Sequence, residues 1–209
     1  MPKNTAPKGL PALFQPIDLT EGPCWKTILR FSFPIILSYL LQQVYSISDA
    51  AIVGQTLSGE QVAGVNDIAP IVNIFLQFAF GVSAGFCVIT SCSVGSRNQS
   101  GVRRSLAAQI VLSAVLTVLL TTLALAVLNP MLAWINVTPD SGAVYTAAHT
   151  YCALIFAGIG AQLFYNFICS FLRSMGDSVT PLAFLLFSTV LNVGLDLLFI
   201  IVFRWGVAG

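Results

Sequence analysis

The sequence predicts an all-α fold, a bundle of helices that cross a membrane. Of its 209 residues, 56% are apolar and only 8% are charged, and the mean hydropathy is +0.88. Soluble domains carry about 25% charged residues. The apolar residues also gather into stretches that reach the roughly 20 residues needed to cross a bilayer as a helix. Composition and clustering together exclude a water-soluble globular protein.

Five stretches are long and apolar enough to be complete transmembrane helices: residues 28–53, 68–94, 105–128, 144–172 and 181–203. Glycine and asparagine follow the first two, and the third is expected to end before Pro130. Between the fourth and the fifth, Gly176 is expected to end one helix, Thr180 to cap the next and Pro181 to occupy its first turn. Residues 205–209, spaced by glycines, resemble the start of a sixth helix.

The basic residues indicate how the helices are oriented. Residues 1–23 form a polar, proline-rich tail that lacks the pattern of a secretory signal peptide. Basic residues precede the first span, separate the second from the third and follow the fourth, whereas the alternate connections carry Glu60 and Asp140 without Lys or Arg. Cytoplasmic loops hold the excess of Lys and Arg, so the N-terminal tail is predicted to be cytoplasmic.

Polar residues within the spans recur at steps of three, four or seven, which gives each helix one polar side. A lipid-facing amide or acid would lack partners, so these stripes are expected to converge on a bundle interior or an aqueous cavity. Taken singly, Ser, Thr, Asn and Gln can also simply join helices to one another. The stripes are Gln42, Ser46 and Asp49; Asn66, Asn73 and Gln77; Gln109, Ser113 and Thr117; Gln162 and Asn166; Ser188, Asn192 and Asp196.

Asp49 and Asp196 are the main functional signal, because a carboxylate inside a span costs about 2.5–3.5 kcal/mol. Asn192 lies one helical turn before Asp196, on the same face of its helix. At 1.5 Å per residue, Asp49 lies about 31 Å, and Asp196 about 22 Å, from the inner end of its span. Both therefore fall in the outer half of the membrane. The three residues are predicted to hold one proton, or to act as oxygen ligands of one Na⁺.

Other conspicuous residues are interpreted as structural. Asp67, near the predicted start of the second span, is a weaker candidate for the cation site and is interpreted as a helix cap. The pair Gly81 and Gly85 is interpreted as a close contact between helices. Pro34 permits a kink in the first span, as a hinge or as a tolerated proline. His149 and the five cysteines lack metal-ligand spacing, and no catalytic triad or phosphate loop is present, so an enzyme is not expected.

Two parts of the chain resemble the multidrug and toxic compound extrusion (MATE) transporters. The first contains Leu19-Thr-Glu-Gly-Pro-Cys-Trp-Lys26, Gln42-Gln-Val-Tyr45 and Asp49-Ala-Ala-Ile-Val-Gly54. The second contains Leu172-Arg-Ser-Met-Gly-Asp-Ser-Val-Thr-Pro181, followed by Leu191-Asn-Val-Gly-Leu-Asp196. The resemblance implies two helical lobes around a central cavity, of which residues 24–209 would supply an incomplete N-terminal lobe.

The resemblance also implies a function, the antiport of H⁺ or Na⁺ that drives organic, often cationic compounds out of the cell. It matches Asp49, Asn192 and Asp196 to the cation site of the N-terminal lobe, and Pro34 to a hinge in the first helix. No cofactor and no nucleic acid are expected. Expected partners are drugs or metabolites, the plasma membrane, and a second lobe or a second copy of the chain. The expected substrate cavity comprises Gln42, Tyr45, Ser46, Asn73, Gln77 and Asn166.

Three alternatives to an extrusion antiporter are weighed. A lipid-linked precursor flippase of the same superfamily would favour basic cavity residues for phosphate, whereas residues 31–94 contain no Lys or Arg. An intramembrane aspartyl protease would need Gly-x-Gly-Asp on a helix, but this chain has Ser174-Met-Gly-Asp177 in a predicted loop. A nonfunctional fragment is the third alternative, because five spans supply only part of the expected transporter.

The predicted orientation can be tested by cysteine labelling in a background without the native cysteines. A cysteine at Ser58 is expected to react with an impermeant thiol reagent added outside intact cells, because this connection lacks basic residues. A cysteine at Ser100, in the arginine-rich connection, should stay unlabelled until the cells are opened. Labelling of the cysteine at position 100 but not of the one at position 58 would show that the orientation in the membrane is opposite to the predicted one.

Overall fold

The computed structural model describes Leu19 and residues 22–203 and 205–208. Most of the predicted N-terminal tail therefore lies outside the described residues. The described part is all-helical, as predicted, and contains no strand. Its α-helices are α2 (Cys24–Thr56), α3 (Gly59–Gly95), α4 (Gln99–Trp134), α5 (Ala143–Ala157), α6 (Ile159–Ser174) and α7 (Val179–Asp196). Three short elements complete it, the 3₁₀ turns η1 (Pro139–Ser141) and η3 (Gly206–Ala208) and the π-helix η2 (Leu197–Val202).

Length and composition support the predicted membrane spans. Four helices are long and apolar enough to cross a bilayer by themselves, namely α2, α3, α4 and the continuous segment formed by α7 and η2. Helices α5 and α6 meet at Gly158 at an angle of 46° and together make a fifth span. The predicted fourth span is thus a broken helix rather than a straight one. The sequence gives no reason beyond Gly158, a residue that permits such a bend.

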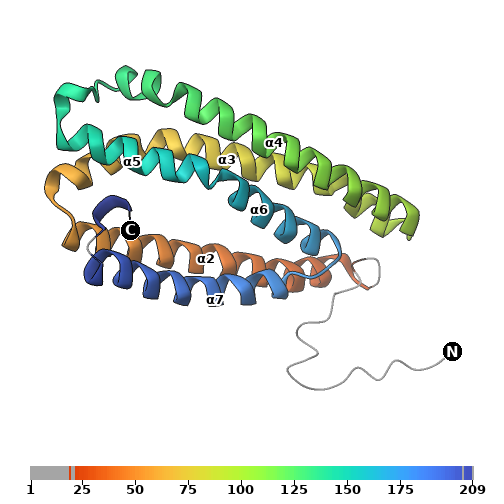
Figure 1. Ribbon diagram of the computed structural model, residues 1–209. Helices are drawn as coiled ribbons and strands as arrows, with labels where there is room; N and C mark the ends of the chain where they lie inside the picture. Colours follow the sequence, from red (N-terminus) through yellow and green to blue (C-terminus); the bar gives the residue numbers. More distant parts are fainter. Residues whose placement is uncertain (1–18, 20–21, 204, 209) are drawn as a thin grey trace.

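The helices fall into two groups (Figure 1). Helices α2 and α7 lie side by side and run in the same direction, while α3 packs against α4, α5 and α6. Few contacts join the groups: α2 touches α3, and α6 touches α7, only lightly. The connections α3–α4 and α6–α7 lie at the same end of the bundle as the start of α2. The basic connections therefore share one end, as the alternation of charge in the sequence requires.

The hydrophobic core lies inside the α3–α6 group. Its fully buried side chains come from all four helices, and partly buried residues such as Phe75 pack against them. This packing explains why α4 continues past Pro130 to Trp134, although the sequence predicts an earlier end. Leu132 is completely buried beyond the proline, and the core contacts of that last turn outweigh the lost backbone hydrogen bond. The largest core residues are Ile68, Leu120, Leu128, Leu132, Phe156, Ile159 and Leu163.

The polar stripe of α4 does not face a cavity shared with the other stripes. The Gln109 amide donates to Ser105 Oγ at 2.9 Å, to the Phe86 carbonyl at 3.0 Å, and to Thr90. Thr117 donates to the Ser113 carbonyl of its own helix. Of the two expected surroundings, a bundle interior or an aqueous cavity, this stripe has the first, since Gln109 is buried against α3. Gln109 joins α3 to α4, the role that amides commonly take between membrane helices.

Two helix starts differ from the prediction. Helix α3 begins at Gly59, where Ser58 and Gln61 form a reciprocal capping box. Asp67 is consequently an exposed residue inside α3 and caps nothing. Asp177, rather than Thr180, caps α7, because its Oδ1 accepts hydrogen bonds from the amides of Val179 and Thr180. In both cases a polar side chain caps the start of the helix, as expected, but the capping residue is not the predicted one.

Close approach between helices depends on Gly64, not on the expected glycine pair. A Cβ at Gly64 would lie 2.5 Å from the Val144 carbonyl oxygen of α5, a distance that real side chains do not adopt. At Gly81 and Gly85, a Cβ would meet nothing within 4 Å. The interpretation of these two glycines as a helix contact is therefore wrong for the described chain.

Gly64→Ala is expected to destabilise the fold by about 1–3 kcal/mol, because α3 and α5 must separate to admit a methyl group. The measurement is the free energy of unfolding of the purified chain in detergent. Gly81→Ala is the matched control, and helix propensity alone should make it neutral or slightly stabilising. Equal effects of the two substitutions would contradict the close approach at Gly64.

Candidate functional site

The two membrane acids meet at one cavity. Asp49 of α2 and Asp196 at the end of α7 line a space of about 360 Å³, together with Tyr45 of α2 and Tyr151 of α5. The parallel packing of α2 on α7 brings the acids to similar depth. Asp49 is close enough to act electrostatically on Asp196 and on both tyrosines. We name this space the acid cavity.

Asn192 adds an amide to the acid cavity. It lies one turn before Asp196, interacts with the Tyr45 hydroxyl, and lines an adjoining space with Gln42 and Ser188. Asn192 Oδ1 and Asp196 Oδ2 are buried and have no hydrogen-bond partner. Unpaired buried oxygens are uncommon because they lose their hydration without compensation. Their presence on one face of α7 marks a position where a cation or a proton would supply the missing partner.

The donor set limits the kind of ion that fits. Among the residues that the structure describes, three or more His, Cys, Asp or Glu side chains nowhere gather as they would around a transition metal. The acid cavity instead offers carboxylate, amide and phenol oxygens. Hard oxygen ligands with two acids suit Na⁺ or a proton.

A π-helix begins directly after Asp196. The segment Leu197–Val202 is wound more widely than α7, although the two form one continuous helix. Single π-turns inside α-helices occur frequently at functional sites. The sequence of this segment is uniformly apolar and carries no signal for the change in winding.

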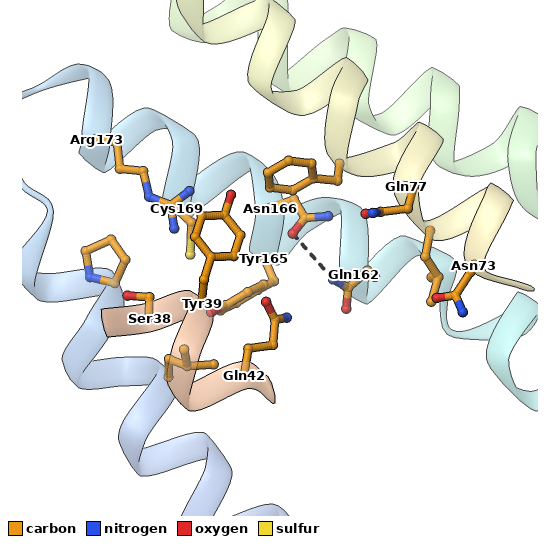
Figure 2. Close-up of a pocket in the computed structure, with 14 residues that line it drawn as sticks. Ser38, Tyr39, Gln42, Asn73, Gln77, Gln162, Tyr165, Asn166, Cys169 and Arg173 are labelled. Atoms are coloured by element: carbon orange, nitrogen blue, oxygen red, sulfur yellow. Dashed lines mark hydrogen bonds between the residues drawn. The ribbon is translucent and has the colours of Figure 1, made fainter. Parts of the chain in front are cut away.

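A second cavity, of about 410 Å³, lies between the two helix groups (Figure 2). We name it the polar cavity. Four of the six residues predicted for a substrate cavity line it: Gln42, Asn73, Gln77 and Asn166. Tyr45 lines the acid cavity and the space that adjoins it. Ser46 is exposed, and its hydroxyl donates to the Gln42 carbonyl of its own helix; it lines neither cavity of the described chain, and its place at a substrate cavity stays a prediction.

Several residues of the polar cavity were missed by sequence reasoning. Tyr39, Tyr165 and Arg173 line it, but only amides, hydroxyls and acids were sought along the stripes. Helical spacing could have indicated the tyrosines, because Tyr39 lies three residues before Gln42 and Tyr165 directly precedes Asn166. Arg173 was assigned to a connection, whereas α6 extends to Ser174 and includes it.

Pro34 lies within an uninterrupted α2, which runs from Cys24 to Thr56. The Ser38 hydroxyl donates to the Pro34 carbonyl at 2.8 Å. A hinge at Pro34 stays a prediction, because the structure presents one conformation of α2.

An all-helical bundle with long apolar spans and interior polar cavities defines a membrane transport protein rather than a soluble one. A family model confirms this class and makes it specific: the MatE model matches residues 34–198, and the chain belongs to that family. The matched range contains Asp49, Asn192 and all the lining residues of the polar cavity.

Known relatives agree with this assignment. "Probable multidrug resistance protein YpnP" of Bacillus subtilis (strain 168) is 34% identical over 92% of this chain and 42% of its own length. "Probable multidrug resistance protein NorM" of Thermotoga maritima is 29% identical over 82% of this chain and 36% of its own. A solved outward-facing MATE multidrug resistance transporter shares the fold, with a TM-score of 0.84 at 24% identity, over 93% of this chain and 42% of that one. The chain thus spans about two fifths of the length of the curated relatives it matches.

Replacing Asn192 by leucine tests whether its oxygen serves the fold or a ligand. Asn192→Leu loses the interaction with the Tyr45 hydroxyl but removes the unpaired Oδ1, so the unfolding free energy of the purified chain is expected to change by less than about 1 kcal/mol. The comparison is Gln109→Leu, which removes several hydrogen bonds and should cost about 1–3 kcal/mol. Equal destabilisation by the two substitutions would show that Asn192 is a structural residue.

Proposed function

We propose that this chain forms the N-terminal lobe of an antiporter that exports organic, often cationic compounds in exchange for H⁺ or Na⁺. The observation that carries the proposal is the pairing of Asp49 and Asp196 across one cavity, beside the unpartnered oxygen of Asn192. Membership of the MatE family and the multidrug resistance names of two relatives support the class of substrate.

In this proposal, ion binding in the acid cavity is coupled to a conformational change of the lobe. Two ionised carboxylates at one site repel each other, and a cation or a proton between them removes that repulsion. Asp49 and Asp196 belong to the pair α2 and α7, which touches the rest of the lobe lightly. Binding and release of the ion would therefore change the packing of this pair with little cost to the core. Pro34, on α2, is the proposed hinge.

Helix α2 also connects the ion to the exported compound. Gln42 lines the polar cavity, and Tyr45, one turn later, lines the acid cavity. A movement of α2 that accompanies ion exchange would alter both spaces together. Coupling of this kind needs no direct contact between the ion and the compound. It needs only a helix whose position depends on the binding of each of them.

The rejected alternatives have less support. Asp177 is occupied in capping α7 and lies in a turn, so it does not form an acid pair of the protease type. The transporters of the MatE family are not enzymes, and enzymatic activity is not proposed. A flippase would require a phosphate-binding cavity, and among the residues that line the polar cavity only Arg173 is basic.

A second lobe, or a second copy of the chain, is the proposed partner. Gln42, Asn73 and Gln77 are exposed in the described chain, although lipid would leave their amides without hydrogen bonds. A partner that faces these residues would enclose the polar cavity. The proposed location is the plasma membrane, with the N-terminus in the cytoplasm.

Transport measurements with single acid substitutions test the proposal. In vesicles that contain the chain completed by a second lobe, Asp49→Asn or Asp196→Asn should abolish drug movement driven by an imposed Na⁺ or H⁺ gradient. Each removes a charge while nearly preserving volume. The double variant should lose little more than either single one, because both acids serve one site and their effects are not additive. Asn192→Ala should weaken coupling less, as both charges remain.

Asp140→Asn is the control for loss of an acid, since Asp140 is exposed in the α4–α5 connection. It should transport normally after correction for the amount of protein in the membrane. Asp177→Asn is a poor control because Asp177 caps α7. Near-normal coupled transport by both Asp49→Asn and Asp196→Asn would refute the proposed ion site.

A further inference from the structure

Arg173 places a positive charge in the wall of the polar cavity. It occupies the last turn of α6, and Figure 2 shows its side chain beside Cys169 and the cavity tyrosines. It acts electrostatically on Tyr165 and Cys169. Its Nε atom is buried and has no hydrogen-bond partner. Arg173 is also the one charged residue among those that line this cavity.

Asn166 directs a second free donor into the same cavity. The residue is only 6% exposed, and its Oδ1 accepts from Gln162 Nε2 at 3.4 Å. This bond fixes the amide so that Nδ2 is left over, buried and without a partner. Asn166 lies two helical turns before Arg173, so the two side chains share one face of α6. Figure 2 shows both on the cavity side of the helix.

The polar cavity contains no acid that could balance Arg173. Asp177, the nearest acid in the sequence, has one oxygen engaged with two amides of α7. Asp49 and Asp196 line the acid cavity instead. Along α2, Asp49 is eleven residues from Ser38, which lines the polar cavity, a rise of roughly 16 Å. The lobe therefore has an acidic site and a basic site at different depths.

The stability of α6 does not require the donors of Arg173 and Asn166 to be buried. A cation near a helix C-terminus is favourable at an exposed position, whereas burial of an unpaired donor is unfavourable. Arg103 and Arg104, at the same end of the bundle, are exposed to solvent. The burial of Arg173 and Asn166 donors without partners points to a ligand that accepts hydrogen bonds.

We propose that Arg173 and Asn166 bind the oxyanion group, carboxylate or phosphate, of an amphipathic organic compound in the polar cavity. Arginine presents paired donors that match the two oxygens of such a group. Leu76, Phe80 and Leu185 supply an apolar wall for the remainder of the molecule. The volume of about 410 Å³ is in the range of small-molecule sites. The inference rests on the proposed export function and assigns an acidic group to at least some of its substrates.

Equilibrium binding of a matched pair of probes tests the site. The probes are radiolabelled 2-naphthoate and its neutral analogue 2-naphthamide, bound to the purified chain in dodecyl maltoside, a detergent without phosphate. The wild type is expected to bind naphthoate at least about tenfold more tightly than the amide, the gain of a charge-assisted hydrogen bond. Equal affinities for the two probes would overturn the proposal.

Substitutions assign the preference to particular residues. Arg173→Gln should remove the preference for naphthoate, and Arg173→Lys should keep part of it, because the charge remains but the paired donors are lost. Asn166→Ala should weaken naphthoate binding several-fold. Arg103→Gln is the control, since it removes an equal charge from an exposed position at the same end of the bundle. Unchanged naphthoate affinity in a folded Arg173→Gln variant would also overturn the proposal, and circular dichroism establishes that folding.

Competition identifies the source of the oxyanion. Displacement of naphthoate by glycerol 3-phosphate would support the site and assign it to soluble phosphate esters. Displacement by dioctanoylphosphatidylglycerol alone would support it and assign it to lipid headgroups, as in a flippase. Displacement by neither would assign it to carboxylates. The Asp196→Asn variant separates this inference from the proposed antiport, because it should lose ion-coupled transport and keep the preference for naphthoate.

Discussion

The packing of α2 against α7, apart from the other helices, is the constraint on which the rest of the lobe depends. Those two helices carry the acids Asp49 and Asp196, and their parallel course places the acids at one depth. The remaining helices form a conventional core around Leu132 and Phe156. Because the pair contacts this core lightly, polar side chains of α2, α3 and α6 face a space instead of one another. Separation of the two groups thus creates the cavities.

The sequence predicted the elements of this arrangement well. Long apolar runs locate membrane helices reliably, since no other water-free structure satisfies the backbone of a short segment. The cost of a charge in the membrane made Asp49 and Asp196 conspicuous before any packing was known. Helical periodicity placed Asn192 beside Asp196. All three of these inferences depend on local properties of the chain, which a sequence records directly.

Inferences that depend on partners were less successful. The stripe of Gln109, Ser113 and Thr117 has the same periodicity as the stripe of α2, yet Gln109 bonds to α3 and Thr117 bonds to Ser113 of its own helix. Periodicity gives the face of a helix but not what covers it. Gly81 and Gly85 have the spacing of a contact motif but no neighbour, whereas the solitary Gly64 lies against the Val144 carbonyl. Arg173 was missed because α6 continues two residues beyond the predicted end of the span at residue 172, and so includes a residue that was assigned to a connection.

Because of the bend at Gly158, the two halves of a single span line different cavities. Before the bend, α5 presents Tyr151 to the acid cavity; after it, α6 presents Tyr165 and Asn166 to the polar cavity. The 46° bend therefore lies between the part of this span that lines the acid cavity and the part that lines the polar cavity. Sequence changes confined to α6 can therefore reshape the polar cavity while every residue that lines the acid cavity, none of which belongs to α6, is preserved.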